Sequence, residues 1–220
     1  MNQNHEYALL GGMNRAKVGR YISIASATIS AIIMFVVLAL WDAAQALGLP
    51  SNVPPALLSL VGAGMIFAVL YWFFDNHAWR WAPIGGWLKA PDLSGEWSCK
   101  GISLNPDGSI QFDWTGEMTI SQSWDKIRVR LKTPTSGSHS IAAALLCDAT
   151  DGYRLLYHYR NDPKTGQAAL QAGLEPHRGF ADLLFASNRL SAEGDYFNGA
   201  GRFTFGTMKL TKKVTDATGH

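Results

Sequence analysis

Two long apolar runs stand in the first third of the chain, at residues 21–41 and 56–74, and neither contains a charged side chain. At a rise of about 1.5 Å per residue, a helix of either length comes close to the ~30 Å thickness of a bilayer's hydrocarbon core. Uncharged runs of this length are uncommon in the cores of soluble proteins. The pattern therefore predicts a two-helix transmembrane hairpin over residues 21–74, after a polar N-terminal tail at residues 1–20.

Basic residues near this hairpin predict its orientation in the membrane. They stand on both outer flanks: Arg15, Lys17 and Arg20 before the first run, and Arg80 and Lys89 after the second. The connector at residues 42–55 contains neither Lys nor Arg. Because cytoplasmic flanks carry the excess of these residues, we expect a multi-pass membrane protein with both termini and the C-terminal domain in the cytoplasm.

A cleaved signal peptide is the alternative interpretation of the first run. Ala44-Gln45-Ala46 resembles a small-residue cleavage site. However, the apolar run is longer than the usual ~7–15-residue core of a signal peptide, and a second run follows it. Cleavage would leave the C-terminal domain on a single anchor.

Small residues recur at every fourth position within the runs, as at Ser23, Ala27 and Ala31. Such a stripe lets two helices approach closely and pack. The packing could join the two helices of one hairpin, or it could join helices of neighbouring chains. The second possibility predicts self-association within the lipid bilayer.

Residues 75–91 join the hairpin to the rest of the chain. Their three tryptophans suit the water–lipid interface. Pro83 and Gly85-Gly86 predict that no helix continues through this segment. We therefore expect a juxtamembrane hinge.

From Asp92 onward, short segments of alternating apolar and polar residues replace the long runs. Residues 126–132 alternate most clearly, with one apolar face and one basic face that we interpret as the solvent-exposed side of a strand. Turn sequences such as Asn198-Gly199 separate the segments. The pattern predicts an all-β domain at residues 92–220, a small closed antiparallel up-and-down barrel of about eight strands, lipocalin-like and able to hold one small ligand. Basic outward residues exclude a barrel that spans an outer membrane.

Charge and composition exclude several classes of function. The formal net charge is +2, and residues 92–220 carry 14 Lys and Arg against 14 Asp and Glu, so we expect no binding of polymeric nucleic acid. Cys99 and Cys147 are too few for a disulfide framework, and no Cys/His cluster predicts a metal site. The chain has no nucleophile elbow, Walker loop or HExxH motif. We expect neither enzymatic activity nor a cofactor.

Trp97 lies in a Gly95-Glu96-Trp97 sequence that resembles the element opening lipocalin-type barrels. In that fold the tryptophan closes one end of the barrel beneath a basic residue of the final strand, a part that Lys209 or Lys212 could play here. We therefore interpret Trp97 as a core residue and not as a ligand contact.

Aromatic, basic and amide side chains gather in the second half of this domain. Aromatic faces can stack on bases, Arg and His can neutralise phosphates, and Asn or Thr can bond base edges. A one-residue slip of register would exchange the tyrosines of residues 153–159 with their basic neighbours, and core packing is the alternative role for the tyrosines. The predicted ligand-binding residues are Tyr157, Tyr159, Arg160, His177, Tyr196, Asn198, Arg202 and Thr204.

The arrangement resembles a family of bacterial anti-phage effectors of CBASS systems, which have two transmembrane helices and a β-strand-rich barrel. The resemblance covers nearly the whole chain. It rests on this architecture and on three sequences, namely Asp92-Leu93-Ser94-Gly95-Glu96-Trp97, Leu156-Tyr157-His158-Tyr159-Arg160-Asn161, and Gly194-Asp195-Tyr196-Phe197 with Gly206-Thr207-Met208.

The resemblance implies that the cytoplasmic barrel binds a regulatory cyclic di- or oligonucleotide made by a partner synthase. Binding would promote oligomerisation, and the clustered hairpins would disrupt the inner membrane of the infected cell. The main alternative is a membrane-tethered, lipocalin-like carrier of a lipid or other apolar ligand, and a membrane-anchored enzyme is a second. An aromatic and basic cavity would favour the nucleotide, and an aliphatic cavity would favour the lipid.

Overall fold

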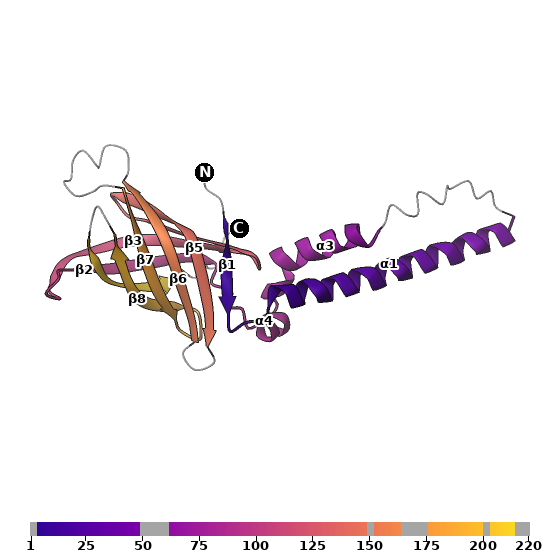
Figure 1. Cartoon of the computed structure of the whole chain (residues 1–220), viewed down its shortest axis with the longest axis horizontal. Coiled ribbons are helices and arrows are strands. Elements are labelled where there is room, and N and C mark those ends of the chain that lie inside the picture. Colours follow the sequence, from indigo (N-terminus) through magenta and orange to yellow (C-terminus); the bar gives the residue numbers. More distant parts are fainter. Residues whose placement is uncertain (1–3, 49–61, 149–151, 164–175, 200–202, 214–220) are drawn as a thin grey trace, which may run out of the picture. The chain divides into compact units, whose positions relative to one another are not determined.

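A computed structural model describes residues 4–48, 62–148, 152–163, 176–199 and 203–213 (Figure 1). The chain divides into two compact units. Residues 13–81 form the helical unit, and residues 1–12 and 82–220 together form the β unit. The N-terminal residues therefore belong with the C-terminal domain.

The helical unit contains α1 (Arg15–Ala46), α3 (Ala63–Asn76) and the short 3-10 helix η1 (Ala78–Arg80). The side chain of Asn14 caps α1, because its Oδ1 accepts a hydrogen bond from the backbone N–H of Ala16 (2.7 Å). Among the described residues, α1 is the one helix long and apolar enough to cross a membrane. The shorter apolar helix α3 packs against it.

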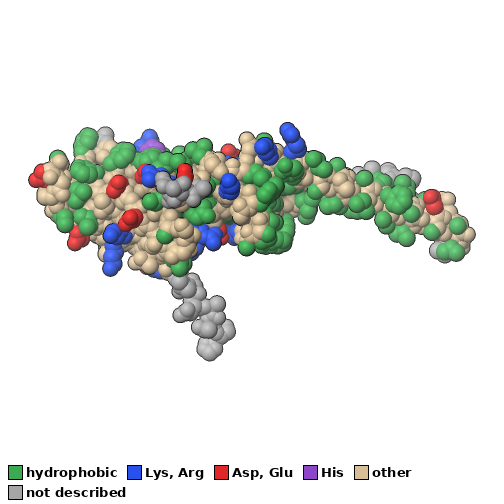
Figure 2. Space-filling view, turned by 90° about the horizontal axis from the view of Figure 1, so that it is seen from below, with side chains coloured by type: hydrophobic (Ala, Val, Ile, Leu, Met, Phe, Trp, Pro, Cys, Tyr) green, Lys and Arg blue, Asp and Glu red, His purple; other side chains and the backbone are tan. Residues whose placement is uncertain are grey.

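The predicted hairpin is described only in part. The first predicted span lies within α1, which begins at Arg15 rather than at Tyr21. The second predicted span begins at residue 56, and residues 49–61 lie outside the described residues. Large apolar side chains cover much of the exposed surface of the helices (Figure 2). The two-helix hairpin stays a prediction.

The segment between the helices and the sheet corrects one expectation. Helix α4 (Ala82–Leu88) runs through Pro83 and both neighbouring glycines, where the sequence predicted no helix. Pro83 stands in the first turn of α4, a position whose backbone N–H has no partner within a helix, so its missing N–H costs nothing.

Within the described residues, the β unit contains nine strands. Their bounds are β1 His5–Leu10, β2 Gly95–Leu104, β3 Ile110–Gln122, β4 Lys126–Lys132, β5 Ser136–Asp148, β6 Gly152–Pro163, β7 His177–Phe185, β8 Ser191–Asn198 and β9 Phe205–Lys212. They form one mixed sheet in the order β1-β4-β3-β2-β9-β8-β7-β6-β5. Pairing of β1 with β5 closes this order into a barrel, and β4 also pairs directly with β5 over a short stretch.

Strand β1 corrects two expectations, the polar tail at residues 1–20 and the wholly antiparallel barrel. It lies between β4 and β5 and runs parallel to β5, with Tyr7 opposite Ala143. Strands β4 and β5 pair directly only over Arg130–Lys132, so β1 fills the seam where they separate. The alternation in β1 is only six residues long, with Tyr7 buried between exposed neighbours. The sequence of this strand does not indicate which distant strands it pairs with.

Trp97 is fully buried, as predicted, and Lys212 is the basic residue above it. The Lys212 Nζ lies 5.3 Å from the centroid of the indole ring, a cation–π arrangement. The register of β2 with β9 pairs these two residues directly. The indole N–H donates to the carbonyl of Leu93 (3.2 Å), and the ring meets Phe185 edge to face at 5.2 Å. Trp97 therefore closes this part of the core.

Gln122 joins both chain segments that lead toward the helices. Its Nε2 donates to the carbonyl of Pro91 (3.0 Å) and to the hydroxyl of Tyr7 (3.4 Å), and its Oε1 accepts from the backbone N–H of Leu93 (2.9 Å). Tyr7 belongs to β1, which leads into α1, whereas residues 91–93 follow α4. One buried amide thus holds both connections to the barrel.

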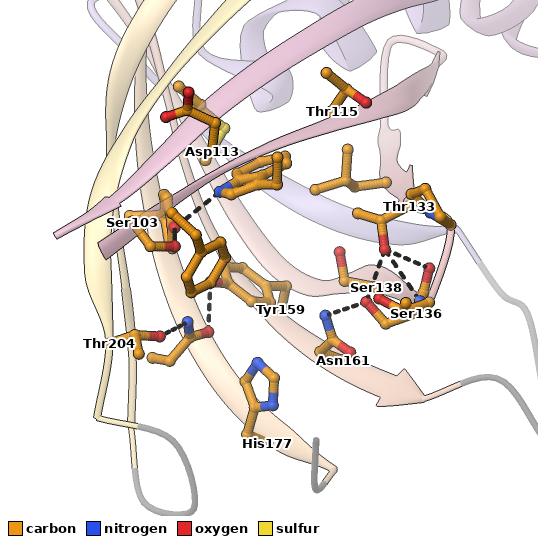
Figure 3. Close-up of a pocket in the computed structure, with 18 of the residues that line it drawn as sticks. Ser103, Asp113, Thr115, Thr133, Ser136, Ser138, Tyr159, Asn161, His177 and Thr204 are labelled. Atoms are coloured by element: carbon orange, nitrogen blue, oxygen red, sulfur yellow. Dashed lines mark hydrogen bonds between the residues drawn. The ribbon is translucent and has the colours of Figure 1, made fainter. Parts of the chain in front are cut away.

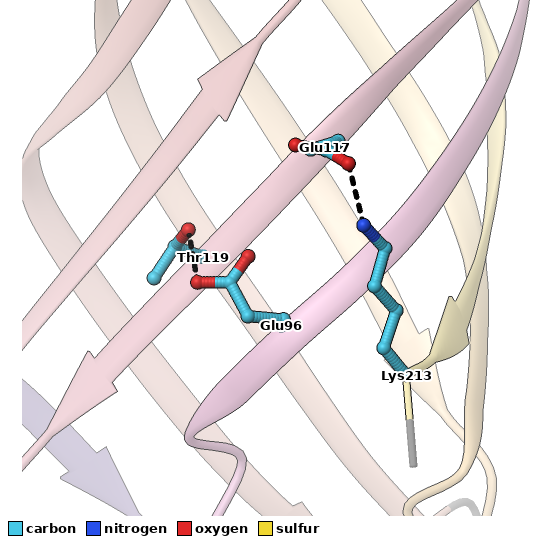
Figure 4. Close-up of polar contacts among 4 residues, drawn as sticks. All are labelled: Glu96, Glu117, Thr119 and Lys213. Carbon is cyan, nitrogen blue, oxygen red and sulfur yellow. Dashed lines mark hydrogen bonds and ion pairs between the residues drawn. The ribbon is translucent and has the colours of Figure 1, made fainter. Parts of the chain in front are cut away.

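The outer wall carries cross-strand polar contacts of an ordinary kind (Figure 4). Thr119 on β3 donates to Glu96 on β2 (2.9 Å), and Lys213 forms an ion pair with Glu117 on β3. Both contacts are exposed to solvent, so each contributes little stability. The stability of the barrel comes mainly from its apolar interior.

If β1 is an integral strand, Tyr7→Ala should destabilise the whole barrel. The substitution removes a fully buried ring and should lower the free energy of unfolding by about 2–5 kcal/mol, as other large-to-small core changes do. Thermal unfolding of the full chain in detergent, followed by circular dichroism, measures the change. Ala8→Ser, on the exposed face of the same strand, is the control, and equal melting temperatures for both variants would contradict the assignment.

Candidate functional site

A cavity of about 640 Å³ lies within one end of the barrel (Figure 3). The connection between β4 and β5 and the first residues of β7 border it. Side chains from β2, β3, β5, β6, β8 and β9 also face it, so one end of the barrel forms the site. Volumes of about 300–1,000 Å³ are typical of small-molecule sites.

Most of the predicted ligand-binding residues meet in this cavity. Six of the eight line it: Tyr157, Tyr159, His177, Tyr196, Asn198 and Thr204. Arg160 lies on the outer face of the barrel, and Arg202 lies outside the described residues. That these six residues bind a ligand stays a prediction.

The alternation along β6 decides which of its residues reach the cavity. Tyr157 and Tyr159 are buried on the inner face, whereas Arg154 and Arg160 point outward. Arg154 pairs with Asp182 (3.1 Å), and Arg160 pairs with Asp162 (3.0 Å). Arg160 therefore cannot share a cavity with Tyr159, since successive side chains of a strand point to opposite faces.

A first hydrogen-bonded group fixes Tyr196. Its hydroxyl accepts from the indole N–H of Trp114 (3.0 Å) and shares a hydrogen bond with the hydroxyl of Ser103 (2.6 Å). The two rings meet edge to face with centroids 5.7 Å apart. Gly101 makes room for this arrangement, because a Cβ at that position would lie 2.1 Å from the Trp114 ring.

A second group fixes Tyr159. Its hydroxyl donates to Oδ1 of Asn198 (2.9 Å), and Nδ2 of Asn198 donates to the hydroxyl of Thr204 (2.8 Å). Gly179 stands opposite Tyr159 in the register, and a Cβ there would lie 2.4 Å from the tyrosine hydroxyl. The ring is therefore held in place before any ligand arrives.

A third group lies where β4 turns into β5. Ser136 and Thr133 bond each other through backbone and side chain, and Nδ2 of Asn161 donates to the hydroxyl of Ser136 (3.3 Å). The predicted ligand-binding set did not include Asn161 or Ser136, nor Ser103 and Trp114 of the first group. Two signals for this wall were available: the alternating serines at residues 136–140, and the position of Asn161 two residues after Tyr159.

The described cavity lining combines aromatic and other apolar surface with hydroxyl and amide groups, and it carries little charge. It contains no Lys or Arg, and Asp113 and His177 are its ionisable groups besides the tyrosines. Burial raises the pKa of Tyr157 well above its usual value, and the nearby Tyr159 and Cys99 raise it further. The phenol therefore stays neutral at physiological pH and can act in hydrogen bonding or stacking.

Burial disfavours the thiolate form of both cysteines. Both are free thiols, and burial raises the pKa of Cys99 to about 12 and that of Cys147 to about 11. Since the thiolate is the reactive form, burial makes both side chains poor nucleophiles. Among the described residues, no group of three or more His, Cys, Asp or Glu side chains could hold a metal ion.

A second hollow, of about 490 Å³, lies on the outer wall and includes Arg160. The register places four basic side chains in line across adjacent strands, and we call them the outer basic row: Arg130, His139, Arg160 and Arg178. The prediction that β4 turns a basic face to the outside is confirmed for Arg130, which is exposed. The row lies one position along the strands from the rim residues Ser138, Asn161 and His177.

Comparison with known proteins decides the family. Residues 16–80 match the family model described as Cap15, TM helices, and residues 88–212 match the model described as Cap15, cyclic dinucleotide receptor domain. The chain belongs to the Cap15 family. It is 41% identical over 210 residues to the CD-NTase-associated protein 15 of Yersinia aleksiciae, a match that covers 96% of this chain and 98% of the relative.

Membership of the Cap15 family confirms the resemblance to CBASS effectors that the sequence motifs indicated. The two family models divide the chain much as the structure does, with α1, α3 and η1 in the first and β2 to β9 in the second. All the described residues that line the cavity lie in the second. Strand β1 precedes both matched segments.

The first hydrogen-bonded group predicts the effect of Tyr196→Phe. Losing the hydroxyl leaves the indole N–H of Trp114 without its partner and should lower the free energy of unfolding by about 1–3 kcal/mol. Thermal unfolding of the full chain in detergent measures the difference. Tyr153→Phe, at a half-buried position of β6, is the control. An unchanged melting temperature for Tyr196→Phe would mean that the hydroxyl is not a structural partner of Trp114.

Proposed function

We propose that the barrel is a cytoplasmic sensor that binds a cyclic dinucleotide in its cavity. Binding promotes association of several chains, and the clustered apolar helices then disrupt the inner membrane of an infected cell. One observation carries this proposal. The segment that matches a cyclic dinucleotide receptor domain encloses a cavity with a prearranged lining of aromatic, hydroxyl and amide groups.

The chemistry of the lining fits a nucleotide better than a lipid. Tyr157 and Tyr159 offer ring faces for stacking, and Asn198 and Thr204 lie at the same end of the cavity. A lipid carrier would need a mainly aliphatic wall, yet Leu131, Pro134 and Met208 are the aliphatic side chains among the described lining residues. These observations disfavour the lipid-carrier alternative.

The negative charge of the ligand has two sources of compensation in this proposal. Arg202, which lies outside the described residues, is predicted to contact a phosphate. The outer basic row borders the cavity rim and raises the positive potential there, which favours the approach of a dianion. The row contributes to the rate of binding, whereas the interior groups contribute to affinity.

The membrane part of the proposal rests on the match of residues 16–80 to a model of TM helices and on the length and composition of α1. We propose that residues 56–74 complete a hairpin, with both chain termini in the cytoplasm. This orientation exposes the barrel to a ligand made inside the cell by a partner synthase.

Two chain connections can carry a signal from the barrel to the helices. Strand β1 is followed within four residues by Asn14, the cap of α1, and residues 91–93 follow α4. Gln122 bonds to both connections. A ligand can drive association only if it binds the associated state more tightly than the free state, so we propose that binding changes the geometry of these connections.

Ligand binding is tested by thermal unfolding of the full chain in detergent with a panel of cyclic di- and trinucleotides. One member should raise the melting temperature by several degrees, because a ligand at 100 times its dissociation constant stabilises the folded state by about 2.7 kcal/mol. Melting temperatures that stay constant across the whole panel would contradict the proposed function.

Two neighbouring variants on β6 serve as a matched pair for that experiment. Tyr159→Leu removes the stacking surface and should weaken binding by about 5–150-fold, since a base stacked on an aromatic ring contributes about 1–3 kcal/mol. Arg160 points outward, so Arg160→Gln should change the affinity by no more than about twofold at high salt, where the charge of an exposed residue is screened. The reverse pattern would place the ligand on the outer wall.

Gating is tested by dye release from liposomes that contain the purified chain. We expect release only after addition of the cyclic dinucleotide that stabilises the chain, because association follows binding. Liposomes that leak equally with and without the ligand would show that the helices disrupt the bilayer without the control of the barrel.

A further inference from the structure

Asn161 is a cavity residue with an unusual hydrogen-bond state. It lies at the rim, between Ser138 on β5 and His177 on β7 in the register of the sheet (Figure 3). Its Nδ2 donates to the hydroxyl of Ser136 (3.3 Å). Its Oδ1 is buried and accepts no hydrogen bond.

The neighbouring hydroxyls fix the orientation of this amide. The hydroxyl of Thr133 can donate to the carbonyl of Ser136 (3.2 Å), and the hydroxyl of Ser136 can donate to that of Thr133 (3.1 Å). The oxygen of Ser136 is then an acceptor toward Asn161. The NH₂ group of Asn161 therefore faces Ser136, and its carbonyl oxygen is the atom left over.

A buried carbonyl oxygen without a donor costs about 1–3 kcal/mol, and folded proteins contain few of them. Other polar groups of this cavity are already paired, as the bonds of Tyr159, Asn198 and Tyr196 illustrate. Among the described residues that line the cavity, Asn161 contributes the one buried side-chain oxygen or nitrogen without a partner. Such an atom is suited to a donor that arrives with a ligand.

We propose that Asn161 determines the base specificity of this site: its Oδ1 accepts a hydrogen bond from an N–H group on the edge of a nucleobase of the bound cyclic dinucleotide. The inference rests on the proposed function. A phosphate cannot satisfy this atom, because phosphate oxygens are themselves acceptors. The donor must come from another part of the ligand.

The position of Tyr159 indicates that the donor belongs to a base of the ligand. It stands two residues before Asn161 on the same face of β6, and its ring is held by the bond to Asn198. A base stacked on this ring presents its edge toward Asn161. Imino groups of uracil and guanine, and exocyclic amines of adenine, cytosine and guanine, are the N–H donors that a carbonyl oxygen can read.

The test combines a protein change with a ligand change, in the full chain in detergent. The ligand is the cyclic dinucleotide that gives the largest thermal shift, and its analogues carry methyl groups in place of the base N–H hydrogens. Titration calorimetry measures the affinities of the wild type and of Asn161→Leu. His158→Gln, on the outer face of the same strand, is the control.

We expect Asn161→Leu and base methylation each to weaken binding by about 10–100-fold, and we expect their effects not to add, because both remove the same hydrogen bond. His158→Gln should bind both ligands as the wild type does. The methylated ligands also test the unaltered protein, so the result does not depend on the folding of the variant.

Several outcomes would overturn the inference while the proposed function stands. One is a wild type that binds the parent and methylated ligands equally, and another is an Asn161→Leu variant with wild-type affinity. In a third outcome, Asn161→Leu weakens binding, but its effect fails to add to that of removing a ribose 2′-hydroxyl, measured with a 2′-deoxy analogue, and does add to that of base methylation. The partner of Asn161 would then be the ribose and not the base. A wild type that binds no cyclic dinucleotide would instead contradict the proposed function and this inference together.

Discussion

The alternation of side chains along the closed sheet is the constraint on which this site depends. In β6 it sends Tyr157, Tyr159 and Asn161 to the interior and Arg160 to the outer wall. A slip of one residue would exchange these two sets and replace a neutral, hydrogen-bonded interior with a charged one. The many paired groups inside, from Trp114 with Tyr196 to Asn198 with Tyr159, hold the register in place.

The closure of the sheet depends on a strand from the other end of the chain. Strands β4 and β5 separate beyond their short pairing, and β1 fills the seam with Tyr7 turned inward. Because β1 leads directly into α1, the same strand both completes the barrel and connects it to the apolar helix. A change in the barrel seam therefore has a short covalent path to the membrane segment.

Sequence patterns predicted the features that depend on local periodicity. The apolar run within α1 and the strands after Asp92 follow from such patterns, whereas the burial of Trp97 follows from the resemblance of its motif to a lipocalin element. Tyr157, Tyr159 and Tyr196 of the predicted set line the cavity. Features that depend on long-range pairing were missed. The partners of β1 are distant in sequence, and Asn161 and Ser136 become neighbours only through the register of β5 with β6. Arg160 was misplaced because the chemistry of a residue does not reveal its strand face.

The most direct test of the central claim is an experimental structure of the full chain with its cyclic dinucleotide. We predict ligand density inside the barrel, with a base stacked on Tyr159 and the cyclic sugar–phosphate backbone near Asn198 and Thr204. Density on the outer wall, beside Arg130 and Arg160, with an empty interior would contradict the claim. The cavity would then be a structural feature of the barrel and not its sensor site.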